Sequence, residues 1–199
     1  MDSFPAFVPL TGRRVIIVGS GREAEEKAAL FTGAPCQLVR LPADERALRP
    51  ELYSGVALVF IGDCDPAYAE AARAAARVGG AMLVNCVDKP ALCDFFTPSI
   101  VDRGAVVGAV GTTGRAPGLA RRLRTEIDAR WPKGLSWLAE LISTMKPEAR
   151  SVLPEFDARR DFLDSLLDGP EAAMALDGDV QGALERARET LRARESSPR

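Results

Sequence analysis

Five short stretches of the chain are rich in apolar and β-branched residues, the composition expected of buried β-strands. The stretch Val56–Ile61 reads VALVFI without a polar residue, which is typical of a parallel strand covered on both faces. We therefore predict strands at residues 13–18, 36–41, 56–61, 81–87 and 105–110.

Between these strands, apolar positions recur with the spacing of amphipathic helices. Arg22–Thr32 places its apolar residues on one face, and Asp65–Arg77 is rich in alanine. Asp65 is placed to cap the second of these helices, with Pro66 in its first turn. The alternation of strand and helix predicts a right-handed α/β fold with a parallel sheet.

The pattern changes after Pro117, where only helical periodicity remains. Breaks that contain proline or glycine at residues 131–134, 146–147 and 168–170 separate the predicted helices. These helices cover residues 119–130, 135–144, 152–167 and 180–194. The sequence thus indicates an α/β part followed by a helical part, with a frayed tail at residues 195–199.

Composition narrows the range of possible chemistry. The 199 residues are 47% hydrophobic, enough for a sizeable core, and the net charge of −2 favours no class of partner. The absence of histidine removes the commonest metal ligand and general base, and no metal site is predicted. Four cysteines without a CxxC pair indicate reduced thiols. With no signal-peptide pattern and no membrane-spanning run, we expect a soluble cytoplasmic protein.

A glycine-rich turn directly follows the first predicted strand and opens a helix. Its residues form the pattern GxGxxA, which binds the pyrophosphate of a dinucleotide at a helix N-terminus. The first glycine permits the tight turn, the second allows close approach of the backbone, and the alanine permits close helix–sheet packing. The predicted cofactor contacts here are Gly19, Gly21, Arg22, Glu23 and Ala24. The alternative is a glycine-rich turn without a ligand.

The end of the second predicted strand carries a cation where an acidic residue would bind the ribose of NAD. Arg40 stands there, and an arginine at this position suits the 2′-phosphate of NADP. The alternative is that Arg40 is simply exposed to solvent. The neighbouring Leu41 and Pro42 complete this part of the predicted cofactor site.

Three loops are expected to meet at the carboxyl edge of the sheet, where open α/β folds bind ligands. They read GSGREA, GDCDP at residues 62–66, and NCVDKP at residues 85–90. Asp65 and Asn85 are predicted to contact the cofactor, and Asp88 is the candidate catalytic base beside the nicotinamide. The alternative is that Asp88 only satisfies its own turn.

A locally basic stretch runs from Arg103 to Lys133, opposed there only by Glu126 and Asp128. Arginine clusters bind carboxylates and phosphates through paired hydrogen bonds, although a solvated helix face has the same composition. A small polar turn precedes the basic helix. The predicted substrate contacts are Arg103, Thr112, Thr113, Gly114, Arg115 and Arg121.

Four motifs together resemble a known family. The segments GSGREAEEKA, NCVDKP, FFTPSIVDRG and AVGTTGRAPGLARRLR follow one another as in the N-terminal module of siroheme synthase, the precorrin-2 dehydrogenase/sirohydrochlorin ferrochelatase family. The resemblance covers residues 1–140 most closely. It implies an NAD-binding Rossmann-like domain at residues 1–97, a dimerisation segment at 98–130 and a helical C-terminal domain at 131–194.

The resemblance also implies a reaction. The family oxidises precorrin-2 to sirohydrochlorin with NAD, often followed by insertion of Fe²⁺ as a substrate, and works as an intertwined homodimer. Asp88 matches the aspartate that supports both steps, and Thr112 matches a hydroxyl position on the substrate side. The basic belt suits the carboxylate arms of a tetrapyrrole.

Two other classes of function stay open from sequence. The first is an NADP-dependent reductase of a small substrate, favoured by Arg40, and the second is a non-catalytic domain that senses a nucleotide. Binding of nucleic acid is not expected, because the basic stretch lacks interleaved aromatic residues.

Overall fold

A computed structural model describes residues 2–195, which form two compact units. The first unit extends to Thr97 and includes Thr113–Ala116. The second unit comprises Pro98–Thr112 and the residues from Pro117 onward.

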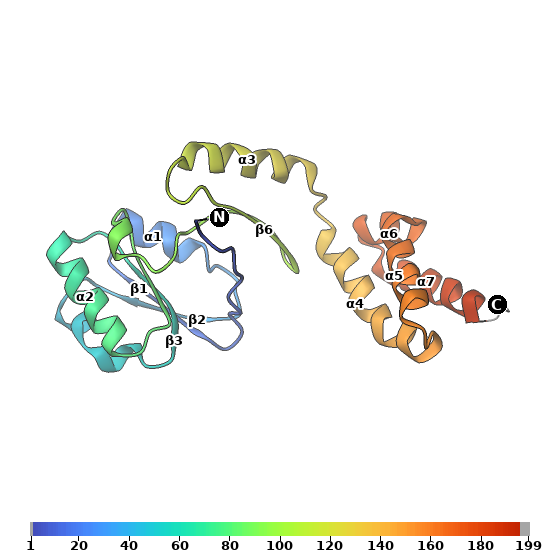
Figure 1. Ribbon diagram of the computed structural model, residues 1–199, viewed down its shortest axis with the longest axis horizontal. Helices are drawn as coiled ribbons and strands as arrows, with labels where there is room; N and C mark the ends of the chain where they lie inside the picture. The colour runs from blue at the N-terminus through green and yellow to red at the C-terminus, as the bar shows by residue number, and fades with distance from the viewer. Residues whose placement is uncertain (1, 196–199) are drawn as a thin grey trace. The chain divides into compact units, whose positions relative to one another are not determined.

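A four-stranded parallel sheet forms the centre of the first unit (Figure 1). Its strands are β1 (Arg14–Val18), β2 (Gln37–Leu41), β3 (Val56–Ile61) and β4 (Leu83–Cys86), in the order β2-β1-β3-β4. Val18 is level with Leu41 on one side and with Ile61 on the other, and Ile61 is level with Cys86. The loops that leave the four strands therefore start at one edge. The predicted α/β, Rossmann-like fold class is confirmed.

Two helices cover opposite faces of this sheet. The side chains of Val15 and Ile17 pack with α1 (Arg22–Ala29), whereas those of Ile16 and Val18 pack with the alanines of α2 (Pro66–Val78). Because both faces are covered, all six residues of β3 are buried. The predicted cap of α2 is confirmed, since the Asp65 carboxylate accepts a hydrogen bond from the N–H of Tyr68 at 2.9 Å.

The order of the strands reverses between β1 and β3. From β1 the chain crosses through α1 to β2, and then returns through two 3₁₀ turns, η1 (Glu45–Leu48) and η2 (Pro50–Tyr53), to β3 on the other side of β1. A third 3₁₀ turn, η3 (Pro90–Leu92), follows β4. A reversal of this kind opens a crevice at the carboxyl ends of the two central strands, where α/β folds bind ligands.

The second unit begins with an antiparallel hairpin of β5 (Ser99–Arg103) and β6 (Val106–Val110), followed by α3 (Pro117–Arg130). The prediction that residues 105–110 add a fifth strand to the parallel sheet was wrong. A two-residue turn connects the strands, with Gly104 at a φ of +71° and its N–H bound to the Asp102 carboxylate. This tight turn pairs β6 with β5 instead.

Four helices complete the second unit: α4 (Leu135–Val152), α5 (Phe156–Asp168), α6 (Pro170–Leu176) and α7 (Val180–Glu195). The predicted helical C-terminal region is confirmed, but the predicted break at residues 146–147 was wrong. The stripe of Leu141, Met145 and Ala149 is fully buried on one face of α4, and it favours a helix that continues through Pro147. No helix was predicted at α6, and α5 begins four residues later than predicted. Among residues 2–195, none of the helices combines the length and hydropathy needed to cross a lipid bilayer.

Candidate active site

The glycine turn between β1 and α1 lies at the reversal point of the sheet. Gly19 has a φ of +124°, and its N–H donates to the carbonyl of Leu41 at 2.9 Å. A Cβ atom on Gly19 would lie 2.5 Å from the Gly62 carbonyl oxygen and 3.3 Å from the Cβ of Ala24. Ala24 itself is buried. The backbone thus has the left-handed turn and the close helix–sheet packing that the sequence pattern predicts for these positions.

A carboxylate of the next loop sits on the first turn of α1. The N–H groups of Gly21, Glu23 and Ala24 donate to the Asp63 carboxylate at 3.0, 3.1 and 2.8 Å. In return, the Glu23 carboxylate accepts the N–H of Asp63 at 2.7 Å. The backbone N–H of Ala24, followed by those of Glu23 and Gly21, lowers the pKa of Asp63 because these bonds favour its charged form. Asp63 thus acts as a cap supplied from about 40 residues away in the chain.

The end of β2 presents a cation that is already paired. The Arg40 guanidinium donates to the carboxylate of Glu25 on α1. The Leu41 carbonyl is engaged by the turn, and the Pro42 carbonyl accepts the N–H of Asp44 at 2.9 Å. A ribose near this edge would therefore meet both the Glu25 carboxylate and the Arg40 guanidinium.

The remaining predicted residue of the turn, Arg22, points outward. Its Nε atom donates to Glu26 on the next turn of α1 at 2.7 Å, and its side chain is largely exposed. An exposed pair of this spacing contributes little to stability, so the Arg22 guanidinium can exchange partners at low cost.

The loop after β4 carries the two residues predicted to face the nicotinamide. Asn85 is buried, and its amide donates to the Phe95 carbonyl at 2.8 Å and to the Cys93 sulfur at 3.4 Å. Asp88 is exposed and has a φ of +55°. The Lys89 ammonium donates to the Cys64 carbonyl at 3.3 Å, which ties this loop to the loop after β3. Asn85 thus fixes the loop, and Asp88 is the member that faces solvent.

The predicted substrate contacts divide between the two units. Thr113, Gly114 and Arg115 belong to the first unit, where the Arg115 guanidinium donates to Asp2 at 2.9 Å. Thr113 has a φ of +51°, which is rare for a β-branched residue. Thr112, Arg103 and Arg121 belong to the second unit. Arg121 is exposed on α3.

Arg103 is committed to internal contacts. Its side chain is only 8% exposed, and its guanidinium donates to the Asp128 carboxylate at 2.6 Å and the Asp128 carbonyl at 3.0 Å. The Arg103 guanidinium holds the pKa of Asp128 below its ordinary value. A second arginine of the predicted belt, Arg124, donates to the Ile100 carbonyl at 3.0 Å. Part of the basic belt therefore joins α3 to β5.

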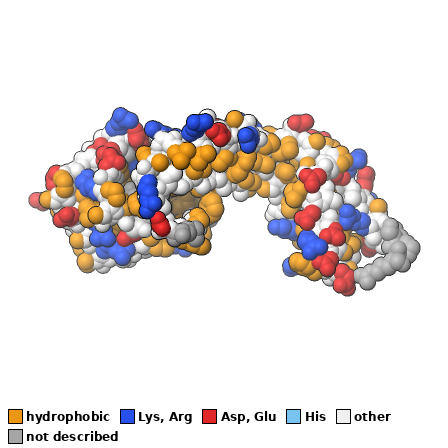
Figure 2. All heavy atoms as spheres, turned by 45° about the horizontal axis from the view of Figure 1, so that its top comes forward, with side chains coloured by type: hydrophobic (Ala, Val, Ile, Leu, Met, Phe, Trp, Pro, Cys, Tyr) orange, Lys and Arg blue, Asp and Glu red, His pale blue; other side chains and the backbone are white. Residues whose placement is uncertain are grey.

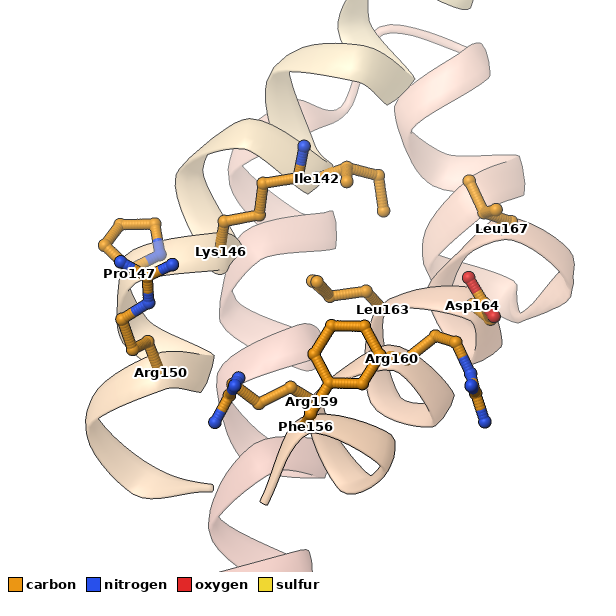
Figure 3. Close-up of a pocket in the computed structure, with 10 residues that line it drawn as sticks. All are labelled: Ile142, Lys146, Pro147, Arg150, Phe156, Arg159, Arg160, Leu163, Asp164 and Leu167. Carbon is orange, nitrogen blue, oxygen red and sulfur yellow. The ribbon is translucent and has the colours of Figure 1, made fainter. Parts of the chain in front are cut away.

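An open cavity of about 620 Å³ lies in the helical part of the second unit (Figure 3). Apolar and basic side chains of α4 and α5, including Ile142, Leu163, Phe156 and Lys146, surround it. It contains none of the sequence-predicted site residues. Within residues 2–195 no cluster of three or more metal-ligating side chains is present either.

Comparison with known proteins agrees with this architecture. Residues 6–99 match a family model for NAD(P)-binding domains, and residues 134–191 match the model described as the sirohaem synthase dimerisation region. Siroheme synthase of Methylococcus capsulatus is 36% identical over 200 residues, which cover 92% of this chain and 42% of that protein. Siroheme synthase of Nitrosomonas eutropha is 34% identical and covers 96% of this chain and 44% of that protein. The chain is related to the N-terminal module of the siroheme synthase family.

The chain spans less than half the length of these siroheme synthases. A solved structure described as SirC, precorrin-2 dehydrogenase, aligns with a TM-score of 0.64 over 94% of this chain and all of that chain. Its sequence identity is 14%, so this likeness concerns the fold. The match to the siroheme synthase dimerisation region falls within the part predicted from sequence as the helical C-terminal domain.

The glycine turn lies in the part of the chain that matches the NAD(P)-binding family model, and it could accept the phosphates of that cofactor if the Asp63 side chain moved. A Cβ atom on Gly19 would collide with the Gly62 backbone, whereas one on Gly21 would meet only the Asp63 side chain. The N–H groups that would hold these phosphates are, however, bonded to Asp63.

Two residues of this site were missed by sequence reasoning, Asp63 and Glu25. Asp63 lies in the GDCDP loop directly after β3, and its position after a strand was the available signal. Glu25 carried no local signal, because its pairing with Arg40 depends on the β1–β2 register.

Proposed function

We propose that the chain is an NAD-dependent dehydrogenase that oxidises precorrin-2 to sirohydrochlorin in siroheme biosynthesis. One observation carries the proposal: in a relative of siroheme synthase, the glycine turn leaves β1 and the Asp88 loop leaves β4, on either side of β3 and at the same edge of the sheet. Open α/β folds bind ligands at such an edge, which supports a cofactor and a base acting there together.

The proposed oxidation removes a hydride and a proton from precorrin-2. NAD, when bound, supplies the acceptor of the hydride. Asp88 takes the proton, since its carboxylate is exposed on a loop whose backbone Asn85 and Lys89 hold in place. Arg115 and Arg121, with the hydroxyl groups of the threonine turn, bind the carboxylate arms of the tetrapyrrole.

We propose ferrochelation as a second activity at the same position. Insertion of Fe²⁺ into sirohydrochlorin displaces two pyrrole protons, and in a chain without histidine the Asp88 carboxylate is the base that can accept them. Fe²⁺ is a substrate in this step.

The proposed enzyme is a homodimer, with residues 98–130 taking part in the interface. On α3, Leu119 and Leu123 are 51% and 38% exposed and lie one helical turn apart. Figure 2 shows apolar side chains gathered beside the charged ones along this helix. A cytoplasmic location suits the four cysteines, which form no disulfide among the described residues.

Anaerobic incubation of the protein with precorrin-2 and NAD, followed by absorbance, tests the oxidation. Wild type should form sirohydrochlorin with one NADH per tetrapyrrole, and Asp88→Ala should turn over at least about 100-fold more slowly while NAD affinity is unchanged. Fe²⁺ or Co²⁺ added afterwards tests insertion of the metal. Binding of NAD without oxidation by wild type would leave a sensor, and turnover with NADP alone would favour a reductase of another substrate.

A further inference from the structure

The anion-binding position of the glycine turn is filled by a carboxylate of the same chain. Three backbone N–H groups at the start of α1 converge on Asp63 within 3.1 Å. The N–H groups of a first helical turn are otherwise open to an external anion, and in dinucleotide-binding turns that anion is the pyrophosphate.

The position of Asp63 follows from the topology of the sheet. Gly62 directly follows β3 and lies next to the glycine turn that follows β1, where the Gly62 N–H donates to the Val18 carbonyl at 3.0 Å. A Cβ atom on Gly21 would lie 2.5 Å from an Asp63 carboxylate oxygen, so the space beside the second glycine is already taken. The same space and the same N–H groups would receive the cofactor's phosphates.

A carboxylate and a pyrophosphate cannot both occupy this position. Each N–H group makes one strong hydrogen bond, and two anions at this separation repel each other. Asp63 is exposed, so its side chain can swing into solvent without disturbing the core. Its φ of +52° lies in a region that Asp and Asn tolerate better than most residues.

We propose that Asp63 is an internal competitor for the cofactor: its carboxylate caps α1 in the free protein and leaves when the pyrophosphate binds. The inference rests on the cofactor part of the proposed function. Asp63 keeps the N–H groups of α1 satisfied between turnovers. It lowers the affinity for oxidised and reduced NAD alike, because both carry the same pyrophosphate, and so favours release.

Replacing Asp63 should therefore tighten binding of phosphate-bearing ligands. In calorimetric titrations of the full chain, Asp63→Asn is expected to raise the affinity for NAD by about tenfold, since charge-assisted hydrogen bonds no longer have to be broken. Adenosine, which lacks phosphate, should bind wild type and variant equally. Asp44→Asn is the matched control, because Asp44 also caps a turn on this side of the sheet but accepts the N–H of Arg46 instead of those of α1.

Asp63→Gly provides a second variant, since glycine adopts a positive φ freely and removes the carboxylate altogether. It should also bind NAD more tightly than wild type. If the folded variants bind NAD no more tightly than wild type, or bind none, the inference is overturned. It is likewise overturned if adenosine gains as much affinity as NAD. Tighter NAD binding without precorrin-2 oxidation would overturn the proposed function alone.

Discussion

The first unit and the hairpin–α3 segment (β5, β6 and α3) differ in how far they bury their own apolar residues. In the first unit, β3 is buried along its whole length and β1 at four of five positions. Among the described residues of β5 and β6 only Val101 is buried, and in α3 only Ala120. The two helices of the first unit therefore cover both faces of its sheet, whereas the hairpin–α3 segment leaves apolar surface exposed.

The proposed enzyme has to bind both a cofactor and a substrate, and the two regions contribute differently to these two tasks. The proposed cofactor site lies inside the first unit, where the turn at Gly19 would receive the cofactor and the Asp63 cap would oppose it. The proposed substrate contacts include Arg115 of the first unit and Arg121 of the second. Changes in the first unit should thus act on NAD affinity, and changes in the hairpin–α3 segment should act on assembly and turnover.

The largest effect is expected from Gly19→Ala. The added Cβ would collide with the Gly62 carbonyl, so the turn must open and NAD affinity should fall at least about 100-fold. The matched control is Gly33→Ala, because Gly33 has a positive φ with open space around the position of a Cβ. It should cost about 1 kcal/mol of stability and leave NAD binding intact. Fluorescence titration with NADH measures the cofactor affinity of both variants. Equal losses of affinity would show that the contact with Gly62 is unimportant.

A moderate effect is expected from Asp128→Asn in the hairpin–α3 segment. The change removes the counter-charge of the buried Arg103, and Tm at pH 7 should fall by roughly 4–8 °C. Because Arg103 lowers the pKa of Asp128, the pair stabilises the fold above the ordinary carboxyl pKa, and this stabilisation is lost as the pH falls through the lowered value. The Tm difference should therefore shrink between pH 7 and pH 3.

Thermal unfolding followed by circular dichroism measures this difference. Asp157→Asn breaks an exposed pair with Arg160 and should change Tm little. A Tm difference for Asp128→Asn that stays constant with pH would contradict the role given to the ion pair.

The smallest effect is expected from Glu25→Gln. Loss of its charge releases Arg40, whose guanidinium then suits the 2′-phosphate of NADP. The ratio of NADP affinity to NAD affinity should rise about three- to tenfold. Glu26→Gln, which alters the neighbouring pair with Arg22, is the control. An unchanged ratio would mean that Arg40 does not contact the adenosine ribose.

Much of the first unit could be predicted from the sequence because its signals are local. A buried parallel strand needs a continuous apolar run, as in Val56–Ile61, and the cap of α2 needs only Asp65 followed by Pro66. The Asp63 contact joins segments about 40 residues apart, and nothing near Asp63 in the sequence indicates its partner.

The second unit was harder to predict because tertiary packing overrides local preference there. The strand Ser99–Arg103 mixes polar and apolar residues, and its pairing with β6 is set by the turn at Gly104. Pro147 would break an isolated helix, but the buried face of α4 continues past it. The roles of Arg103 and Arg121 look equivalent in the sequence, and only the fold shows that Arg103 is buried.

The most direct test of the contrast between the two regions is the mass of the full chain in solution, measured by sedimentation together with an NAD titration. Wild type should sediment as a dimer, and the double variant Leu119→Lys/Leu123→Lys as a monomer with unchanged NAD affinity. A wild-type monomer at micromolar concentration, or a monomeric variant that no longer binds NAD, would contradict the account.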